Sequence, residues 1–169
     1  MSSTLKYISS YPTELKQQVR LMIDEDRLAS FLLAKYHTTH DIKNDKALSE
    51  YVMGLKNHYL KKSGPLSKIV FDNKIHVINN ALGLHCYVSR VQGRKFKSKN
   101  EIRISTVFKK APQEFLSMIT VHELAHLKEK DHGKAFYQLC RHMLPDYYQL
   151  EFDMRLYLIQ LELAGAIYT

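Results

Sequence analysis

Residues 120–136, "TVHELAHLKEKDHGKAF", contain three histidines and a glutamate within one short stretch. His122 and His126 are four residues apart, so on a helix they project from one face about one turn apart. That separation lets two imidazoles reach one Zn²⁺ at roughly 2.0–2.1 Å each. Glu123 lies beside the pair, where its carboxylate can act as the general base of an H-E-x-x-H zinc site. The stretch therefore predicts a zinc centre with Glu123 as its catalytic residue.

The residues around the motif argue against a chance occurrence. In a chain with nine histidines, the pattern arises by accident on the order of a few times in a hundred. Periodicity predicts a helix over 111–129 that is apolar on nearly every side, and such a helix is buried. Its apolar residues are Phe115, Leu116, Met118, Ile119, Val121, Leu124, Ala125 and Leu127. Buried histidines and a buried glutamate are costly unless each has a strong partner, and a metal ion provides one.

A third ligand is needed, because catalytic zinc takes three protein ligands and leaves one position open. His132 lies six residues after His126, and on a continuous helix it would be about 9 Å further along. The polar run "KEKD" and Gly133 allow the chain to leave the helix and turn back, so that His132 faces the metal. The alternatives are an acidic ligand further on, Glu151 or Asp153, or no metal role for His132 as a solvated loop residue. We favour His132 because of its reach.

The chain as a whole has the order helices, strands, helices. Helical periodicity predicts helices over 12–36, 45–62, 111–129, 133–143 and 147–164. Short runs rich in Val, Ile, Tyr and Phe predict strands over 68–71, 74–78, 85–91 and 101–108. This order is typical of an α+β domain rather than an alternating parallel-sheet fold. No repeat or change in composition marks a boundary, so we expect residues 1–169 to form one domain.

The composition indicates a cytoplasmic protein with ordinary globular content. The N-terminus lacks the basic and apolar regions of a secretory signal. The most apolar stretch, "LYLIQLELAGAIYT" (156–169), is too short and too interrupted to span a bilayer, so we expect no membrane partner. Two cysteines provide no disulfide framework. The net charge of +8 favours anionic partners such as nucleotides or nucleic acid, although it would equally serve solubility alone.

The motif and the strands before it resemble the YgjP-like family of zincin-fold metallohydrolases, which is related to the SprT and WLM metallopeptidases. The resemblance rests on "HELAHLKEKDHGKAF" (122–136) and on the preceding segment 72–112. It implies a zincin-like domain with N-terminal helices, a small mixed sheet, an active-site helix and C-terminal helices. It also implies a metal site at His122, His126 and His132 with a catalytic Glu123. Metzincins share the spacing but need a glycine where this chain has Glu129.

The resemblance implies two classes of substrate. Zincins bind a peptide as an added strand along a sheet edge, and the segment 101–108 is the expected edge. The family is also associated with hydrolysis of nucleoside triphosphates, notably UTP. The basic loop that contains Arg90 and Arg94 would suit a triphosphate, although lysine-rich turns more often only protect a sheet edge. Tyr137 and His142, on the helix after His132, are further candidates for transition-state or substrate contacts.

These observations leave three hypotheses for function. We favour a zinc metallopeptidase-type hydrolase in which Glu123 is the general base. The second hypothesis is a metal-dependent UTP pyrophosphatase that uses the same site. The third is a non-catalytic module in which zinc only stabilises the fold and the basic surface binds nucleic acid.

Overall fold

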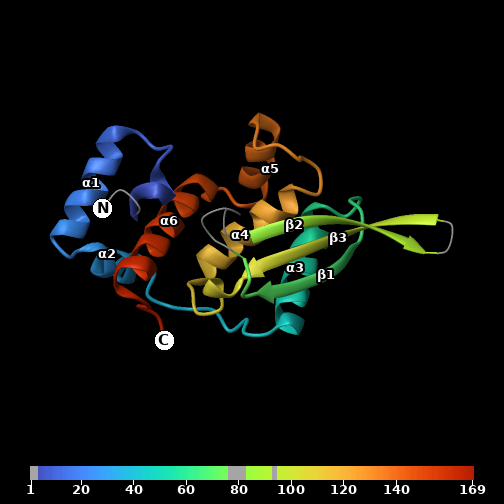
Figure 1. The fold of residues 1–169 in the computed structure, drawn as a ribbon, viewed down its shortest axis with the longest axis horizontal. Coiled ribbons are helices and arrows are strands. Elements are labelled where there is room, and N and C mark those ends of the chain that lie inside the picture. Colours follow the sequence, from blue (N-terminus) through green and yellow to red (C-terminus); the bar gives the residue numbers. More distant parts are fainter. Residues whose placement is uncertain (1–3, 76–82, 93–94) are drawn as a thin grey trace.

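The computed structural model describes the backbone of residues 4–75, 83–92 and 95–169 and the side chains of residues 5–75 and 100–169. Figure 1 shows the N-terminal helices at one end of the molecule, the sheet with its long hairpin at the other, and α4 to α6 between them. The predicted α+β class is confirmed. The elements are η1 (Thr4–Ile8), α1 (Thr13–Asp24), α2 (Leu28–Lys35), α3 (Asp45–Tyr59), β1 (Leu66–Asp72), β2 (Gly83–Gln92), β3 (Lys95–Ser105), η2 (Thr106–Phe108), α4 (Gln113–Ala125), α5 (Lys134–Met143) and α6 (Tyr147–Ala164). Among the described helices, none is both long and apolar enough to cross a membrane.

The first predicted helix, over 12–36, is in fact two helices. The chain breaks after α1 at Asp26, which has a positive φ of 55°. Three consecutive acidic residues, 24–26, occupy this end, where the partial negative charge of the helix terminus disfavours carboxylates. Two backbone bonds close the helix: Asp26 N–H donates to the Ile23 carbonyl and Arg27 N–H donates to the Met22 carbonyl. The prediction of one continuous helix was therefore wrong, because apolar periodicity continues through the break.

The described strands form one mixed sheet in the order β1-β3-β2. β1 runs parallel to β3, and β2 runs antiparallel to β3 with a register that continues to the pair Gln92 and Lys95. The segment 95–100, which lies between the predicted strands 85–91 and 101–108, is therefore part of β3. The predicted strand 74–78 lies largely in residues 76–82, outside the described residues.

The central position of β3 corrects a second prediction. We expected the segment 101–108 to be the exposed edge that accepts a peptide strand. Over 100–104 its backbone instead pairs with β1 on one side and β2 on the other, and 106–108 form η2. A strand with both sides paired has no free row of backbone donors and acceptors to offer. Strand order depends on pairing between distant segments, and the alternation within one segment does not encode it.

Helix α4 lies at the centre of the core. Every residue from Met118 to Ala125 is buried, and the helix contacts β2, β3, α5 and α6. Aromatic contacts join its first half to its neighbours: Phe115 lies 4.7 Å from Tyr36 and 5.5 Å from Tyr157 on α6 between ring centroids. Because α4 is apolar on nearly every side, packing it among these neighbouring elements stabilises the fold. The core thus fixes the helix that contains His122 and Glu123.

Candidate metal centre

Three histidine rings converge at the end of α4. His122 lies in the last turn of α4, His126 is the residue directly after the helix, and His132 precedes α5. One ligand nitrogen of each lies within 4.8 Å of the other two, and the Nε2 atoms of His126 and His132 are 3.0 Å apart. His122 is buried, His126 is half-buried and His132 is exposed. The cluster is therefore open to solvent on the His132 side.

The turn between the two helices places His132. Helix α4 ends at Ala125, four residues earlier than predicted, and the amides of Lys128 and Glu129 donate to the Ala125 carbonyl to close it. The chain then reverses, and the extended backbone of Gly133 begins α5. This reversal within residues 126–133 brings His132 back to the other two rings, although a continuous helix would carry it away.

The hydrogen bond of His126 determines which of its nitrogens can bind a metal. Its Nδ1 lies 2.9 Å from the backbone carbonyl oxygen of Glu129. A carbonyl oxygen only accepts, so Nδ1 carries the proton of the neutral ring. The lone pair is then on Nε2, the atom that faces His132. A histidine that donates its outer N–H to a backbone carbonyl is the usual arrangement in metal sites.

His122 is held neutral by its surroundings. Burial foremost, and then the neighbouring His126 and His132, lower its pKa to about 3. Its Nδ1 lies 2.6 Å from the hydroxyl of Tyr147, on α6. A neutral imidazole keeps a lone pair available for a cation throughout the physiological pH range.

The donor set fits a zinc-type ion. Three neutral imidazoles are one of the ligand sets of catalytic zinc, which keeps a fourth position open. Two nitrogens at 2.0–2.1 Å from a tetrahedral ion are roughly 3.3 Å apart, close to the 3.0 Å between His126 and His132. Among the residues whose side chains are described, these three histidines form the one group of three or more His, Cys, Asp or Glu that could hold a metal.

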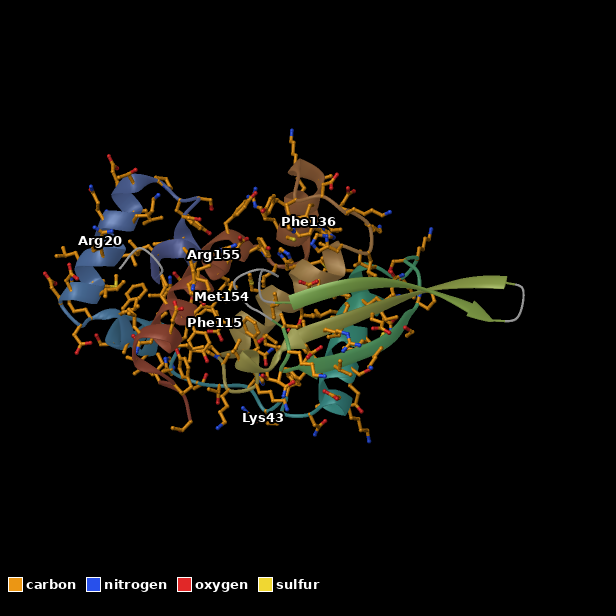
Figure 2. All side chains as sticks on the ribbon, viewed as in Figure 1. Arg20, Lys43, Phe115, Phe136, Met154 and Arg155 are labelled. Atoms are coloured by element: carbon orange, nitrogen blue, oxygen red, sulfur yellow. The ribbon has the colours of Figure 1, made fainter. Side chains whose placement is uncertain are left out.

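A single phenylalanine packs against all three rings. The Phe136 ring centroid lies 5.0 Å from His122, 4.6 Å from His126 and 4.9 Å from His132. Phe136 is fully buried, and Figure 2 shows it beside the end of α4. It restricts the rotation of the imidazoles and excludes water from their inner side. This wall strengthens the electrostatic interactions of any ion bound beyond it.

Glu123 and Cys140 are the other reactive groups near the cluster. Glu123 directly follows His122 on α4 and is only 2% exposed. Cys140 on α5 is also buried, and burial above all raises the pKa of its thiol to about 12, with smaller contributions from the Glu151 carboxylate and, last, the Glu123 carboxylate. The thiol therefore stays protonated and serves as a core residue, whereas Glu123 places a carboxylate within the buried part of the site.

The acidic alternatives to His132 have other partners. Asp153 is fully buried. It accepts a hydrogen bond from the Tyr36 hydroxyl and forms an ion pair with Lys35 of α2. Glu151 forms an ion pair of 3.1 Å with Arg155. The Asp153 contacts fasten α6 to the end of α2, whereas the Glu151–Arg155 pair lies within α6. Neither carboxylate belongs to the group of converging ligand atoms.

The further candidates for transition-state or substrate contacts lie in different places. Tyr137 contacts Phe136, with ring centroids 5.2 Å apart, and so lies next to the cluster. His142 is exposed and its ring contacts Tyr59 of α3, which places it on the α3 side of α5. The side chain of Arg90 and the whole of Arg94 lie outside the described residues.

The sequence analysis did not identify two groups that contact the cluster by hydrogen bonds. The Glu129 carbonyl orients His126, but any residue supplies a carbonyl, so its identity gave no signal. Tyr147 is fully buried against His122. It is 25 residues away and is one of 11 tyrosines, so no local pattern distinguished it.

Comparison with known proteins agrees with the fold and with the predicted resemblance. The sequence model of the YgjP-like metallopeptidase domain matches residues 18–156. The UTP pyrophosphatase of Escherichia coli (strain K12) is 59% identical over 161 residues, which cover 95% of this chain and 96% of that protein. No solved structure matches the chain. The match covers α4, α5 and the three converging histidines, and the chain therefore belongs to the YgjP-like metallopeptidase-domain family.

Proposed function

We propose that this protein is a cytoplasmic, zinc-dependent hydrolase that cleaves UTP to UMP and pyrophosphate. The observation that carries the proposal is the open cluster of three converging histidine side chains beside a buried glutamate, in a chain that is 59% identical to a UTP pyrophosphatase over nearly its whole length. Residues 1–169 would act as one domain, which is supported by Tyr168 at the C-terminus donating to the Tyr36 carbonyl of the N-terminal half.

In this proposal the chain's own residues bind the ion and move the proton. His122, His126 and His132 would hold the metal through one nitrogen each. A bound Zn²⁺ would polarise a phosphoryl oxygen and make a water molecule more acidic. Glu123 accepts a proton from the attacking water, whose oxygen forms a new bond to the α-phosphorus. The bond from that phosphorus to the bridging oxygen breaks, and the proton passes from Glu123 to the pyrophosphate product.

A peptide substrate is the alternative, and the family description favours it. The strand that we expected to bind a peptide is, however, the central one of the described sheet. A peptide would have to pair with another edge, and nothing in the described residues distinguishes one. The third hypothesis, a zinc-stabilised nucleic-acid-binding module, rests on net charge alone. The nucleotide reaction has the stronger support because the similar protein is named for it.

The proposal is tested by assaying zinc-loaded protein with UTP, the other nucleoside triphosphates and a mixed peptide library. We expect one pyrophosphate released per UTP consumed, with the Glu123→Gln variant as the blank. If the wild type cleaves peptides, releases no pyrophosphate from UTP, and loses the peptide cleavage in the Glu123→Gln variant, the protein is a peptidase and not a nucleotide pyrophosphatase. Turnover of neither substrate, with salt-sensitive binding to nucleic acid, would favour the third hypothesis.

An exposed tyrosine that contacts Tyr147, the hydrogen-bond partner of His122, would suit the base of a nucleotide. Tyr148 is 51% exposed, and its ring stacks on Tyr137 with centroids 5.4 Å apart and planes at 29°. The Arg141 guanidinium lies 5.5 Å from the Tyr148 centroid. Tyr148 also contacts Tyr147, the partner of His122. We infer that these side chains form a base-stacking surface, in which Tyr137 supports Tyr148 rather than acting on the reaction.

Replacing Tyr148 by alanine is expected to raise the KM for UTP about tenfold and to leave kcat nearly unchanged. The reason is that stacking of one base on an aromatic ring contributes roughly 1–3 kcal/mol. Inorganic triphosphate, which has no base, should be hydrolysed equally by both proteins. Phe31→Ala is the matched control, because Phe31 is 36% exposed beside Lys35 on α2, away from α5 (Figure 1). An unchanged KM for UTP would contradict the stacking surface.

A further inference from the structure

A chain of buried and half-buried polar groups runs along α6 away from the candidate metal centre. It begins at the Tyr147 hydroxyl, 2.6 Å from His122 Nδ1. Glu151 follows one helical turn later, and Arg155 one turn after that. Arg155 donates to Glu151 Oε1 at 3.1 Å and to the backbone carbonyl of Tyr7 at 2.8 Å. Figure 2 shows Arg155 on the part of α6 that faces the N-terminal segment. The chain thus connects a histidine of the cluster to η1.

The direction of the hydrogen bond between Tyr147 and His122 follows from the charge of Glu151. Tyr147 is fully buried, and a tyrosine hydroxyl, with an ordinary pKa of about 10, is protonated at physiological pH. A hydroxyl has one proton to donate and two lone pairs that accept. The negative charge of Glu151 attracts that proton, so the Tyr147 oxygen is left to accept from His122. The proton of the neutral His122 ring is then on Nδ1.

We propose that Tyr147 is a positioning residue that holds His122 as the Nδ1–H tautomer and so directs the Nε2 lone pair toward the metal. Glu151 sets the direction of this hydrogen bond, and Arg155 fixes the position of the Glu151 carboxylate through their ion pair. With the opposite direction, Tyr147 would donate to Nδ1 and the His122 proton would lie on Nε2, where it blocks a metal. The inference rests on the proposed function, because it assigns these groups to the same metal site.

Tyr147→Phe tests the inference, because it removes the hydroxyl and keeps the buried ring. Tyr157→Phe is the matched control: Tyr157 lies on the same helix, is buried, and donates to the Val107 carbonyl at 3.4 Å. Zinc affinity is measured by competition with a chromophoric chelator. We expect Tyr147→Phe to bind zinc about 10–100-fold more weakly, as is typical when a group that orients a metal ligand is removed. Tyr157→Phe should bind as the wild type does.

Two readouts separate positioning from general stabilisation. The zinc-induced rise in Tm should shrink in Tyr147→Phe, whereas a purely structural loss would lower the Tm of the zinc-free and zinc-bound forms equally. In the zinc-free protein, ¹⁵N NMR of the imidazoles should show His122 as Nδ1–H in the wild type and a shift toward Nε2–H in the variant. Unchanged affinity with an unchanged tautomer would overturn the inference, as would equal Tm losses with unchanged affinity.

Glu151→Gln is a second variant that tests the same inference if Tyr147→Phe does not fold. It retains Tyr147 and a side chain of the same shape, and removes only the charge that orients the hydroxyl. We expect a mixture of His122 tautomers and a smaller loss of zinc affinity than in Tyr147→Phe. A wild-type tautomer and affinity in this variant would contradict the role of Glu151. Wild-type protein that binds no zinc at all would instead overturn the proposed function itself, so the two failures are distinguishable.

Discussion

Glutamine at position 123 is expected to leave about one zinc ion per chain and to lower kcat for UTP hydrolysis by about 10²–10⁴-fold, the usual contribution of a general base. Glutamine has nearly the shape of glutamate, so it fits the buried position on α4, where Glu123 is only 2% exposed. Its amide cannot take the proton of the attacking water. The three imidazoles are unchanged, and they alone are proposed to bind the ion.

The measurement needs metal content and turnover on the same sample. Zinc is quantified by elemental analysis, and pyrophosphate release from UTP is followed at saturating substrate. Glu114→Gln is the matched control, because Glu114 lies nine residues earlier on the same helix, near its N-terminus. It should keep both zinc and activity. A Glu123→Gln variant that retains zinc and wild-type kcat would show that another group removes the proton from water.

The convergence of the three histidines was predictable because it is encoded locally. The spacing of His122 and His126 and the apolar surroundings of Glu123 are properties of one helix, and the structure buries that helix in the core. The polar run after it predicted the reversal that returns His132 to the other two rings. Helices α5 and α6 also begin and end within one residue of the predicted ranges.

What was missed depends on contacts between distant parts of the chain. The order of the strands puts β3 between β1 and β2, a pairing that no single segment specifies. The break at Asp26 requires a left-handed residue that apolar periodicity does not detect. Tyr147 and the Glu129 carbonyl lie within hydrogen-bond distance of His122 and His126, but these contacts follow from where the folded backbone places the two groups and not from a spacing pattern. Strand pairing between distant segments and the hydrogen-bond partners of the histidines therefore follow only from the folded structure.

Replacing His126 by alanine is expected to reduce bound zinc from about one ion per chain to nearly none and to abolish UTP hydrolysis. Loss of a ligand should weaken binding by more than the 10–100-fold seen when only a supporting group is lost. His126 suits this test better than His122, because His126 is half-buried at the end of α4. His122 is buried against Phe136 and Tyr147, so its removal would also leave a cavity.

Stability distinguishes loss of the ligand from loss of the fold. At a zinc concentration of about 100 times its Kd, the wild type should gain about 2.7 kcal/mol from binding, and His126→Ala should gain almost nothing. The zinc-free forms of the two proteins should melt at similar temperatures, because the core around α4 is unchanged. His58→Ala, at an exposed histidine of α3, is the control and should bind zinc normally. If His126→Ala kept a full zinc ion, His126 would not be a ligand, and the metal would have to be bound without one of the two histidines of the H-E-x-x-H motif.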